Sequence, residues 1–193
     1  MATVTATYVT PEEYLARERK ADTRSEYLNG QIFAMAGGTP EHALLALNLA
    51  AELRQALKES PCRVYSSDLR LGVATSGLYT YPDVTVVCGD LVFADDRKDT
   101  VTNPVLLAEV LSDSTKDYDR GEKFQHYRTL ASLQEYLTVA QDTVHVEQYT
   151  RQPTGQWLLT ECNDPSLALQ LSSLGIEIKV ADIYAKVKFG TPG

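Results

Sequence analysis

The sequence predicts an α/β domain in which helices flank a mixed β-sheet. Three observations support this: a long helix with periodic apolar residues, a set of short β-rich segments after it, and a second helix followed by another strand. The chain has 193 residues, of which 44% are hydrophobic and 23% are charged. This length suits one domain with a sizeable core. We therefore expect residues 1–193 to form a single domain whose core spans about 41–140.

The first predicted elements are a short helix and a hairpin. Thr10-Pro11-Glu12-Glu13 has the pattern of a capping box with proline at the first helical position, and it predicts a helix that continues to about Lys20. Downstream, Asn29-Gly30 separates Glu26-Tyr27-Leu28 from Gln31-Ile32-Phe33. Asn-Gly accepts the positive φ angles of a tight turn, so these two segments predict a β-hairpin.

The central part of the chain predicts one long helix and three strands. Gly37-Gly38-Thr39-Pro40 interrupts the chain before a helix over about 41–58, in which Leu45, Leu49 and Leu53 recur with the period of a buried face. The apolar positions of this predicted buried helix also include Leu44, Leu47 and Leu57. The strands follow at roughly 63–73, 80–88 and 105–111, with a polar, exposed loop over 89–103.

The remaining third predicts a second helix and further β structure. Ser112-Asp113-Ser114-Thr115 resembles a turn and helix cap. The elements expected after it are a helix over about 116–130, a strand over 135–140, a hairpin over 144–149 and 156–161, a strand near 167–171 or 175–178, and a short helix near 181–187.

The cysteines and the start of the chain predict a cytoplasmic protein. The first ten residues have neither the basic region nor the apolar run of a signal peptide, and no apolar stretch is long enough to span a membrane. Cys62, Cys88 and Cys162 are odd in number and far apart. Such a set is not typical of a disulfide framework or a zinc site, so we expect reduced thiols in the core.

The formal net charge of −8 argues against a strong nucleic-acid binder. Proteins that bind nucleic acid gain much of their affinity from Lys and Arg side chains that neutralise phosphates. Metal-binding carboxylates would account for a little of this acidic excess, and a local basic groove is compatible with it.

Two carboxylates stand out because they lie in segments that otherwise resemble buried strands. Asp83 follows Tyr81-Pro82 and precedes Val84, and Glu109 lies within Val105–Leu111. Burying an unpaired charge costs on the order of several kcal/mol, even after the protein relaxes around it. If the two strands are neighbours, the carboxylates can together hold Mg²⁺ or Mn²⁺, which prefer oxygen ligands.

Lys123 is the third candidate. On a helix over 116–130, it shares one face with Phe124, Tyr127 and Leu130, which predicts that it points toward the sheet. Taken alone, Lys123 is better explained by pairing with Asp119 four residues earlier while its amine reaches solvent. When Lys123 is considered together with Asp83 and Glu109, a catalytic role for the three residues is favoured.

These residues resemble the Uma-two family of proposed endonucleases, formerly a domain of unknown function. The resemblance covers nearly the whole chain. It rests on motifs that recur in order: Glu26-Tyr27-Leu28-Asn29-Gly30, Thr39-Pro40-Glu41-His42, Tyr81-Pro82-Asp83-Val84, Glu109-Val110-Leu111-Ser112-Asp113-Ser114-Thr115, Asp119-Arg120-Gly121-Glu122-Lys123 and Tyr127. Membership implies the restriction-endonuclease-like fold of the PD-(D/E)XK nucleases.

The resemblance also implies roles for individual residues. Asp83 and Glu109 match the acidic pair of the PD-(D/E)XK signature and would bind one or two Mg²⁺ or Mn²⁺ ions. Leu111 stands where the signature has lysine, and Lys123 would replace that lysine from the following helix. Asp113 stands where the family usually has proline. The implied activity is metal-dependent hydrolysis of phosphodiester bonds in nucleic acid, with DNA favoured.

Two weaker candidates have structural alternatives. Glu26 matches an acidic residue of the family and would complete the metal shell, although a charge at the sheet edge explains it equally well. His42 matches a family histidine, but an imidazole at a helix start is slightly better explained by a structural contact. Asp68, His126 and His145 are expected to be structural or surface residues.

Two other functions stay open at this point. A non-catalytic regulatory or partner-binding dimer that keeps the nuclease fold would agree with the acidic charge and the displaced lysine. A metal hydrolase of smaller phosphoesters would suffer less from that charge. A homodimer through an exposed strand edge would cover that edge.

Overall fold

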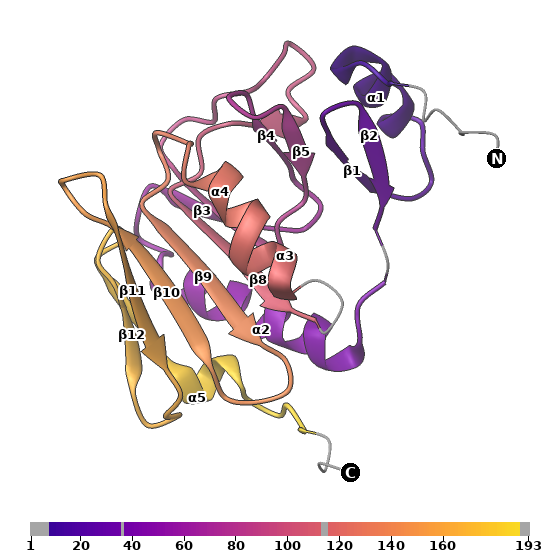
Figure 1. Cartoon of the computed structure of the whole chain (residues 1–193). Coiled ribbons are helices and arrows are strands. Elements are labelled where there is room, and N and C mark those ends of the chain that lie inside the picture. Colours follow the sequence, from indigo (N-terminus) through magenta and orange to yellow (C-terminus); the bar gives the residue numbers. More distant parts are fainter. Residues whose placement is uncertain (1–7, 36, 113–115, 190–193) are drawn as a thin grey trace.

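The computed structural model describes residues 8–35, 37–112 and 116–189, and it confirms the α/β class (Figure 1). The helices and strands in chain order are α1 (Pro11–Glu18), β1 (Ser25–Leu28), β2 (Gln31–Ala34), α2 (Pro40–Ala56), β3 (Cys62–Ser66), β4 (Arg70–Val73), β5 (Leu78–Thr80), β6 (Val84–Cys88), β7 (Thr100–Val101), β8 (Leu106–Leu111), α3 (Lys116–Tyr118), η1 (Asp119–Lys123), α4 (Phe124–Tyr127), β9 (Glu135–Ala140), β10 (Val146–Arg151), β11 (Trp157–Cys162), β12 (Ala168–Leu171), β13 (Ile176–Lys179) and α5 (Val180–Ile183). Within the described ranges, no helix is long and apolar enough to cross a membrane.

A six-stranded mixed sheet forms the centre of the molecule, in the order β11-β10-β9-β8-β6-β3. Only β8 and β9 run parallel in it, and the other neighbours are antiparallel. A second sheet has the order β2-β1-β5-β4-β7, and β12 and β13 form a separate pair. The parallel pair at the centre requires a crossover, which the segment containing α3, η1 and α4 provides.

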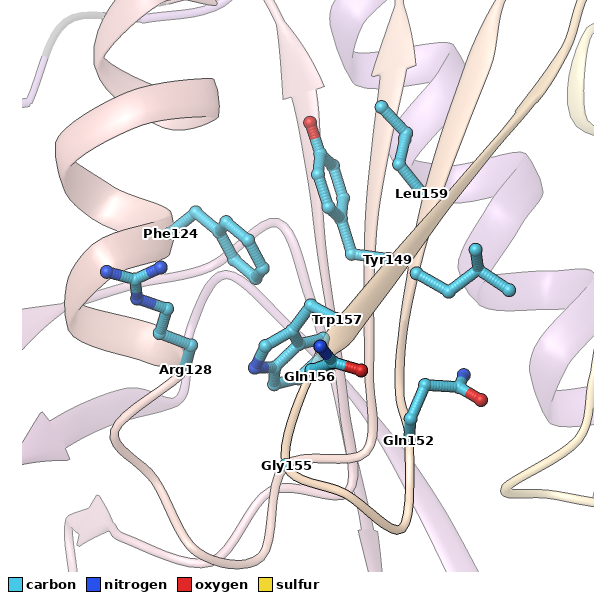
Figure 2. Close-up of a pocket in the computed structure, with 9 residues that line it drawn as sticks. Phe124, Arg128, Tyr149, Gln152, Gly155, Gln156, Trp157 and Leu159 are labelled. Carbon is cyan, nitrogen blue, oxygen red and sulfur yellow. The ribbon is translucent and has the colours of Figure 1, made fainter.

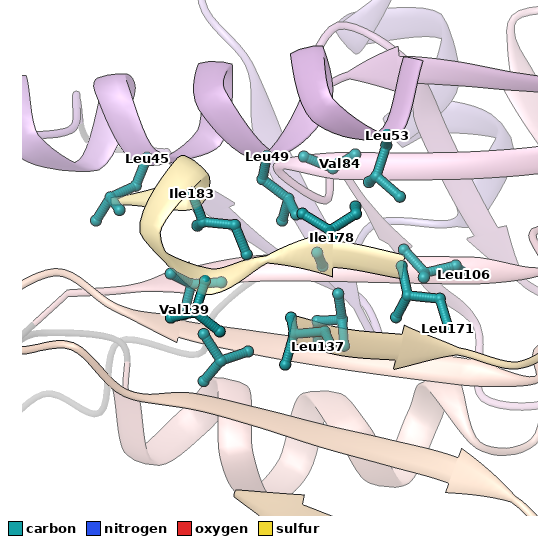
Figure 3. Close-up of a cluster of buried hydrophobic side chains, with 14 of the residues drawn as sticks. Leu45, Leu49, Leu53, Val84, Leu106, Leu137, Val139, Leu171, Ile178 and Ile183 are labelled. Carbon is teal, nitrogen blue, oxygen red and sulfur yellow. The ribbon is translucent and has the colours of Figure 1, made fainter. Parts of the chain in front are cut away.

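One face of the central sheet is covered by α2, α5 and the β12–β13 pair (Figure 3). Leu45, Leu49 and Leu53 of α2 are fully buried there, as their spacing predicts. Leu47 was expected in this apolar set, but 66% of its surface is exposed. A position two residues from both Leu45 and Leu49 faces away from the buried stripe of a helix, which explains the difference.

The opposite face of the central sheet is covered by the α3–η1–α4 segment and part of the second sheet. Leu107 of β8 and Tyr136 of β9 pack there against Phe124 and Tyr127, and Leu71 of β4 joins the same cluster. Alternation along β8 places Leu107 and Glu109 on this face and Leu106 and Ala108 on the other. The sheet therefore turns Glu109 toward the helix that carries Lys123.

The N-terminal helix and hairpin form as expected. Thr10 and Glu13 make both hydrogen bonds of the capping box. The turn between β1 and β2 has Asn29 at φ 49° and Gly30 at φ 87°, as a tight Asn-Gly turn requires. Tyr14 stacks on Tyr27 and anchors α1 on the hairpin.

Several element boundaries differ from expectation. The predicted strands 63–73 and 80–88 each divide in two, because the chain leaves one sheet and enters the other within each segment. The predicted helix 116–130 contains a π-helical turn, η1, and ends at Tyr127. The loop 89–103 contains β7, and both alternatives near 167–178 are strands that pair with each other. The expected cap at Asp113, Ser114 and Thr115 lies outside the described residues.

The expectation of three reduced cysteines is wrong for two of them. Cys62 and Cys88 form a disulfide between β3 and β6, whereas Cys162 is a buried thiol. The two strands pair so that Cys62 lies directly opposite Cys88. Twenty-six residues separate the two cysteines in sequence, so only the pairing of the strands brings them together.

Candidate active site

Asp83 and Glu109 lie side by side on neighbouring strands. Asp83 immediately precedes β6, and the register of β6 and β8 pairs Val84 with Ala108, so Asp83 and Glu109 occupy the next position along the ladder. The amide of Asp83 donates to Oε2 of Glu109 at 3.4 Å, and the amide of Val110 donates to Oδ2 of Asp83 at 2.8 Å. The two carboxylates therefore meet where β6 begins.

Lys123 reaches this pair from η1. Its Nζ lies 3.0 Å from Oε1 of Glu109, 3.1 Å from Oε1 of Glu26 and 3.3 Å from Oδ1 of Asp119. Only 8% of its side chain is exposed. The pairing with Asp119 that explains Lys123 in isolation is present, but the amine does not reach solvent. It lies instead among three carboxylates.

Glu109 and Lys123 have shifted pKa values because both are buried. Burial raises the pKa of Glu109 to about 8; the positive charge of Lys123 opposes this shift, and the negative charges of Asp83 and Asp119 add to it. Burial disfavours the charged form of Lys123, but Glu109, Glu26 and Asp119 together hold its pKa well above the ordinary value. The ammonium group is thus retained by the carboxylates around it.

Glu26 and His42 join the cluster from the N-terminal part of the chain. Glu26, on β1, accepts a hydrogen bond from the Thr80 hydroxyl and pairs with Lys123. His42 lies in the first turn of α2, and its Nε2 is 3.3 Å from Oδ2 of Asp83. The hydrogen bond to Asp83 raises the pKa of His42, although burial acts in the opposite direction. Five candidate residues from five separate segments therefore meet in one place.

Sequence reasoning missed part of this cluster. Tyr127, fully buried, donates from its hydroxyl to Oε1 of Glu109 at 2.7 Å. Asp119 was predicted as the helical partner of Lys123 and as part of a family motif, with no role in the site, and Thr80 gave no functional signal. Asp68 lies outside the cluster, on the surface, in an ion pair with Arg24, as expected.

The donor atoms of Asp83 and Glu109 fit a divalent cation bound by two carboxylates. Among the described residues, Lys123 and Tyr127 contact Oε1 of Glu109, whereas Oε2 has only the long contact with the Asp83 amide. Oδ1 of Asp83 accepts no hydrogen bond from the described part of the chain. One oxygen on each side chain therefore remains for Mg²⁺ or Mn²⁺, with water or substrate oxygens as further ligands.

A groove of about 660 Å³ has none of these carboxylates in its lining (Figure 2). It is bounded by α4 and by the β10–β11 hairpin, and its lining includes Phe124, Arg128, Tyr149 and Trp157. Phe124 directly follows Lys123 in sequence, so the same helical segment contributes to both the groove and the carboxylate cluster.

Known proteins resemble this chain over most of its length. Residues 11–181 match the sequence profile of the Uma2 family, described as "Putative restriction endonuclease". "Uncharacterized protein sll1609" of Synechocystis sp. is 39% identical over 176 residues, which cover 91% of this chain and 99% of that protein. "Uncharacterized protein slr1290" of the same organism is 37% identical over 183 residues, or 94% of each protein.

A crystal structure from Anabaena variabilis, titled as a putative nuclease belonging to DUF820, has a similar fold. Its TM-score is 0.74 at 16% identity, and the match covers 92% of this chain and 98% of that one. Together with the family match, this similarity confirms the expected restriction-endonuclease-like fold, a mixed α/β structure.

Proposed function

Because the chain belongs to the Uma2 family, whose description is "Putative restriction endonuclease", we propose that it is a divalent-metal-dependent endonuclease acting on nucleic acid, with DNA the favoured substrate. The observation that carries the proposal is the meeting of Asp83, Glu109 and Lys123 in one buried cluster. An acidic pair beside a buried lysine supplies both a metal site and a fixed positive charge, which are the two requirements of metal-assisted phosphodiester hydrolysis.

Asp83 and Glu109 are assigned as the metal ligands. A bound Mg²⁺ or Mn²⁺ ion would polarise the phosphoryl oxygens and lower the pKa of the attacking water. The protein fixes both carboxylates in advance: Tyr127 and Lys123 hold Glu109, and the Val110 amide and His42 hold Asp83. His42 and Tyr127 are therefore assigned as positioning residues.

Lys123 is assigned to stabilise negative charge. In the transition state of hydrolysis, charge develops on the phosphoryl oxygens, and a cation already held in place stabilises it without reorganisation. Glu26 shares the Lys123 amine with Glu109, so we assign Glu26 chiefly to positioning Lys123. A direct role of Glu26 as a metal ligand is the weaker assignment.

A non-catalytic module with the same fold is the competing function, and a specific observation favours it. The cluster is already paired internally, because Lys123 contacts three carboxylates and His42 contacts Asp83. The net charge of −8 also disfavours contact with nucleic acid. In this second function the cluster would only hold β1, β8 and η1 together.

Calorimetric titration with Mn²⁺, combined with plasmid nicking, separates the two functions. We expect the wild type to bind Mn²⁺ and to nick supercoiled DNA, and Asp83→Asn to lose both properties. Lys123→Gln should retain Mn²⁺ binding but nick at least about 100-fold more slowly, the scale of one lost transition-state contact. Asp68→Asn, which alters an exposed carboxylate outside the cluster, serves as the control and should retain both.

The nuclease function is contradicted by one combination of results for the wild type. If the wild type nicks no faster than Asp83→Asn and binds no Mn²⁺ in the presence or absence of DNA, the non-catalytic function is correct. Circular dichroism of each variant shows whether it is folded, and Lys123→Arg replaces Lys123→Gln if the latter unfolds.

A further inference from the structure

A row of polar side chains extends from Glu109 across four strands of the central sheet. The registers pair Glu109 with Thr138, Thr138 with Glu147, and Glu147 with Glu161. Residues opposite each other in a ladder point to the same face of the sheet. Adjacent strands are about 4.8 Å apart, so the backbone of Glu147 lies roughly 10 Å from that of Glu109. The far end of the row is therefore separate from the candidate active site.

Three potential metal ligands converge at that far end. One ligand atom each from His145, Glu147 and Glu161 lies within 4.8 Å of the other two. Nε2 of His145 is 3.3 Å from Oε1 of Glu161 and 3.9 Å from Oε1 of Glu147. Glu161 is 59% exposed, so the cluster is open to solvent on one side.

Two independent features indicate that a cation belongs in this cluster. Like charges directly opposite each other on paired strands are destabilising, and Glu147 faces Glu161 in this way. In addition, Nε2 of His145 is buried, and its partners among the described residues are these two carboxylates, to which it makes no well-aligned hydrogen bond. A neutral imidazole protonated at Nδ1 would direct the lone pair of Nε2 at two carboxylates, an arrangement that a metal ion makes favourable, whereas an imidazolium would pair with them.

The surrounding residues also hold Glu147 in place. Thr138 and Tyr149 donate to its Oε2 at 2.8 and 3.2 Å, as outer hydrogen-bond partners of a metal ligand do. Arg120 lies 2.9 Å from Oε1 of Glu147 and compensates part of its charge. It is the competing cation at this position, and no corresponding arginine contact is seen at Glu161 within the described residues.

We propose that His145, Glu147 and Glu161 form a second divalent-metal site, of a composition that suits Zn²⁺ or Mn²⁺. One imidazole nitrogen and two carboxylate oxygens leave coordination positions for water on the open side. Two metals that share one phosphoryl group lie about 4 Å apart, so an ion at this distance from Glu109 would not take part in that chemistry. The proposal does not depend on nuclease activity.

Imidazole ¹⁵N NMR during a Zn²⁺ titration tests the site directly, because the chain has only three histidines. The titration is carried out on the full chain carrying Asp83→Asn and Glu109→Gln, which removes the first metal site. We expect Nε2 of His145 to shift with one equivalent of Zn²⁺. Adding Glu161→Gln should weaken binding at least about tenfold, the loss that even an outer-shell partner causes. Glu177→Gln, an exposed strand carboxylate outside the cluster, should not change it.

The proposal is overturned if His145 does not respond to excess Zn²⁺, or if Glu161→Gln binds as tightly as its parent. A response confined to His42 or His126 overturns it as well. Because Glu161 is exposed, its replacement is well tolerated, and His145→Asn provides a second variant for which the same loss of affinity is expected.

Discussion

At the residue scale, the buried charges around Lys123 carry a large desolvation penalty. Removing one partner of a buried ion pair typically costs about 3–5 kcal/mol, whereas replacing the whole pair with apolar residues is often neutral. Lys123 and Glu109 are both more than nine-tenths buried, and each has polar partners beyond the other. Packing alone does not require such an arrangement. Buried groups with strongly shifted pKa values are typical of functional sites.

The raised pKa of Glu109 makes stability depend on pH. Its pKa is about 8 in the folded chain and near 4.5 when unfolded, so the folded state binds the proton more tightly. This stabilisation is complete below pH 4.5 and is lost as the pH rises toward 8. We therefore expect the free energy of unfolding of the wild type to fall over that range more steeply than that of Glu109→Gln.

Urea denaturation of both proteins at several pH values measures the difference. The raised pKa of His42 also lowers the free energy of unfolding as the pH rises, and it does so in both proteins. The difference between the two pH profiles therefore isolates the contribution of Glu109. Identical pH profiles would mean that Glu109 does not titrate in this range.

At the element scale, the β1–β2 hairpin determines where Glu26 lies. The turn depends on Gly30, whose φ of 87° a residue with a side chain rarely adopts. A Cβ atom at this position would also overlap the ring of Tyr8. Gly77 has a similar φ of 69° but open space around it, so it offers a matched comparison.

We expect Gly30→Ala to destabilise the chain more than Gly77→Ala does. Gly77→Ala should cost about 1 kcal/mol, the usual penalty for a left-handed conformation. Gly30→Ala carries that penalty and must also displace Tyr8. If the overlap is the cause, the two substitutions should cost the same in a Tyr8→Ala background, as measured by urea denaturation. A persistent difference there would point to another cause.

The disulfide between β3 and β6 is a second feature of element scale. It closes a loop between two cysteines 26 residues apart, and such a loop is worth roughly 3 kcal/mol through the unfolded state. We expect dithiothreitol to lower the urea midpoint of the wild type but not that of Cys62→Ser. Cys162→Ala, which alters the buried free thiol, should remain sensitive to the reductant. An unchanged wild-type midpoint would show that the bond contributes nothing to stability.

At the scale of the whole molecule, charge limits how nucleic acid can bind. The net charge is −8, and at least five of the 18 lysine and arginine side chains are paired with carboxylates. The paired residues include Arg19, Arg24, Arg70, Arg120 and Lys123. The excess of acidic side chains repels phosphates, so bound divalent ions would have to supply part of the attraction. Association through the exposed β11 edge, where Leu158 and Leu159 lie on the surface, stays a prediction.

The salt dependence of DNA binding measures the number of phosphate contacts. Each contact contributes about −0.9 to the slope of log K against log salt concentration. We expect a slope shallower than about −3, which corresponds to roughly three contacts or fewer. The measurement is made with Asp83→Asn, so that the DNA is not cut. A much steeper slope would reveal a basic groove that the net charge conceals.

Local patterns in the chain are sufficient to predict several helices, turns and strands of this protein and its main candidate residues. The capping box at Thr10, the Asn29-Gly30 turn and the buried stripe of α2 depend on residues a few positions apart, so their patterns are visible in the chain. Asp83 and Glu109 were identifiable because charge is rare within buried strands.

Which of these residues meet depends on how distant segments pair and pack. Strand pairing places Cys62 opposite Cys88 and continues the row of Glu109 to Glu161, yet the register between distant segments leaves no local pattern in the sequence. The hydrogen bonds from Thr80 to Glu26 and from Tyr127 to Glu109 also join separate segments and leave no local pattern in the sequence. Lys123 illustrates the reason. Its helical partner Asp119 was predictable from spacing, but its burial among three carboxylates depends on the packing of β1 and β8 around η1.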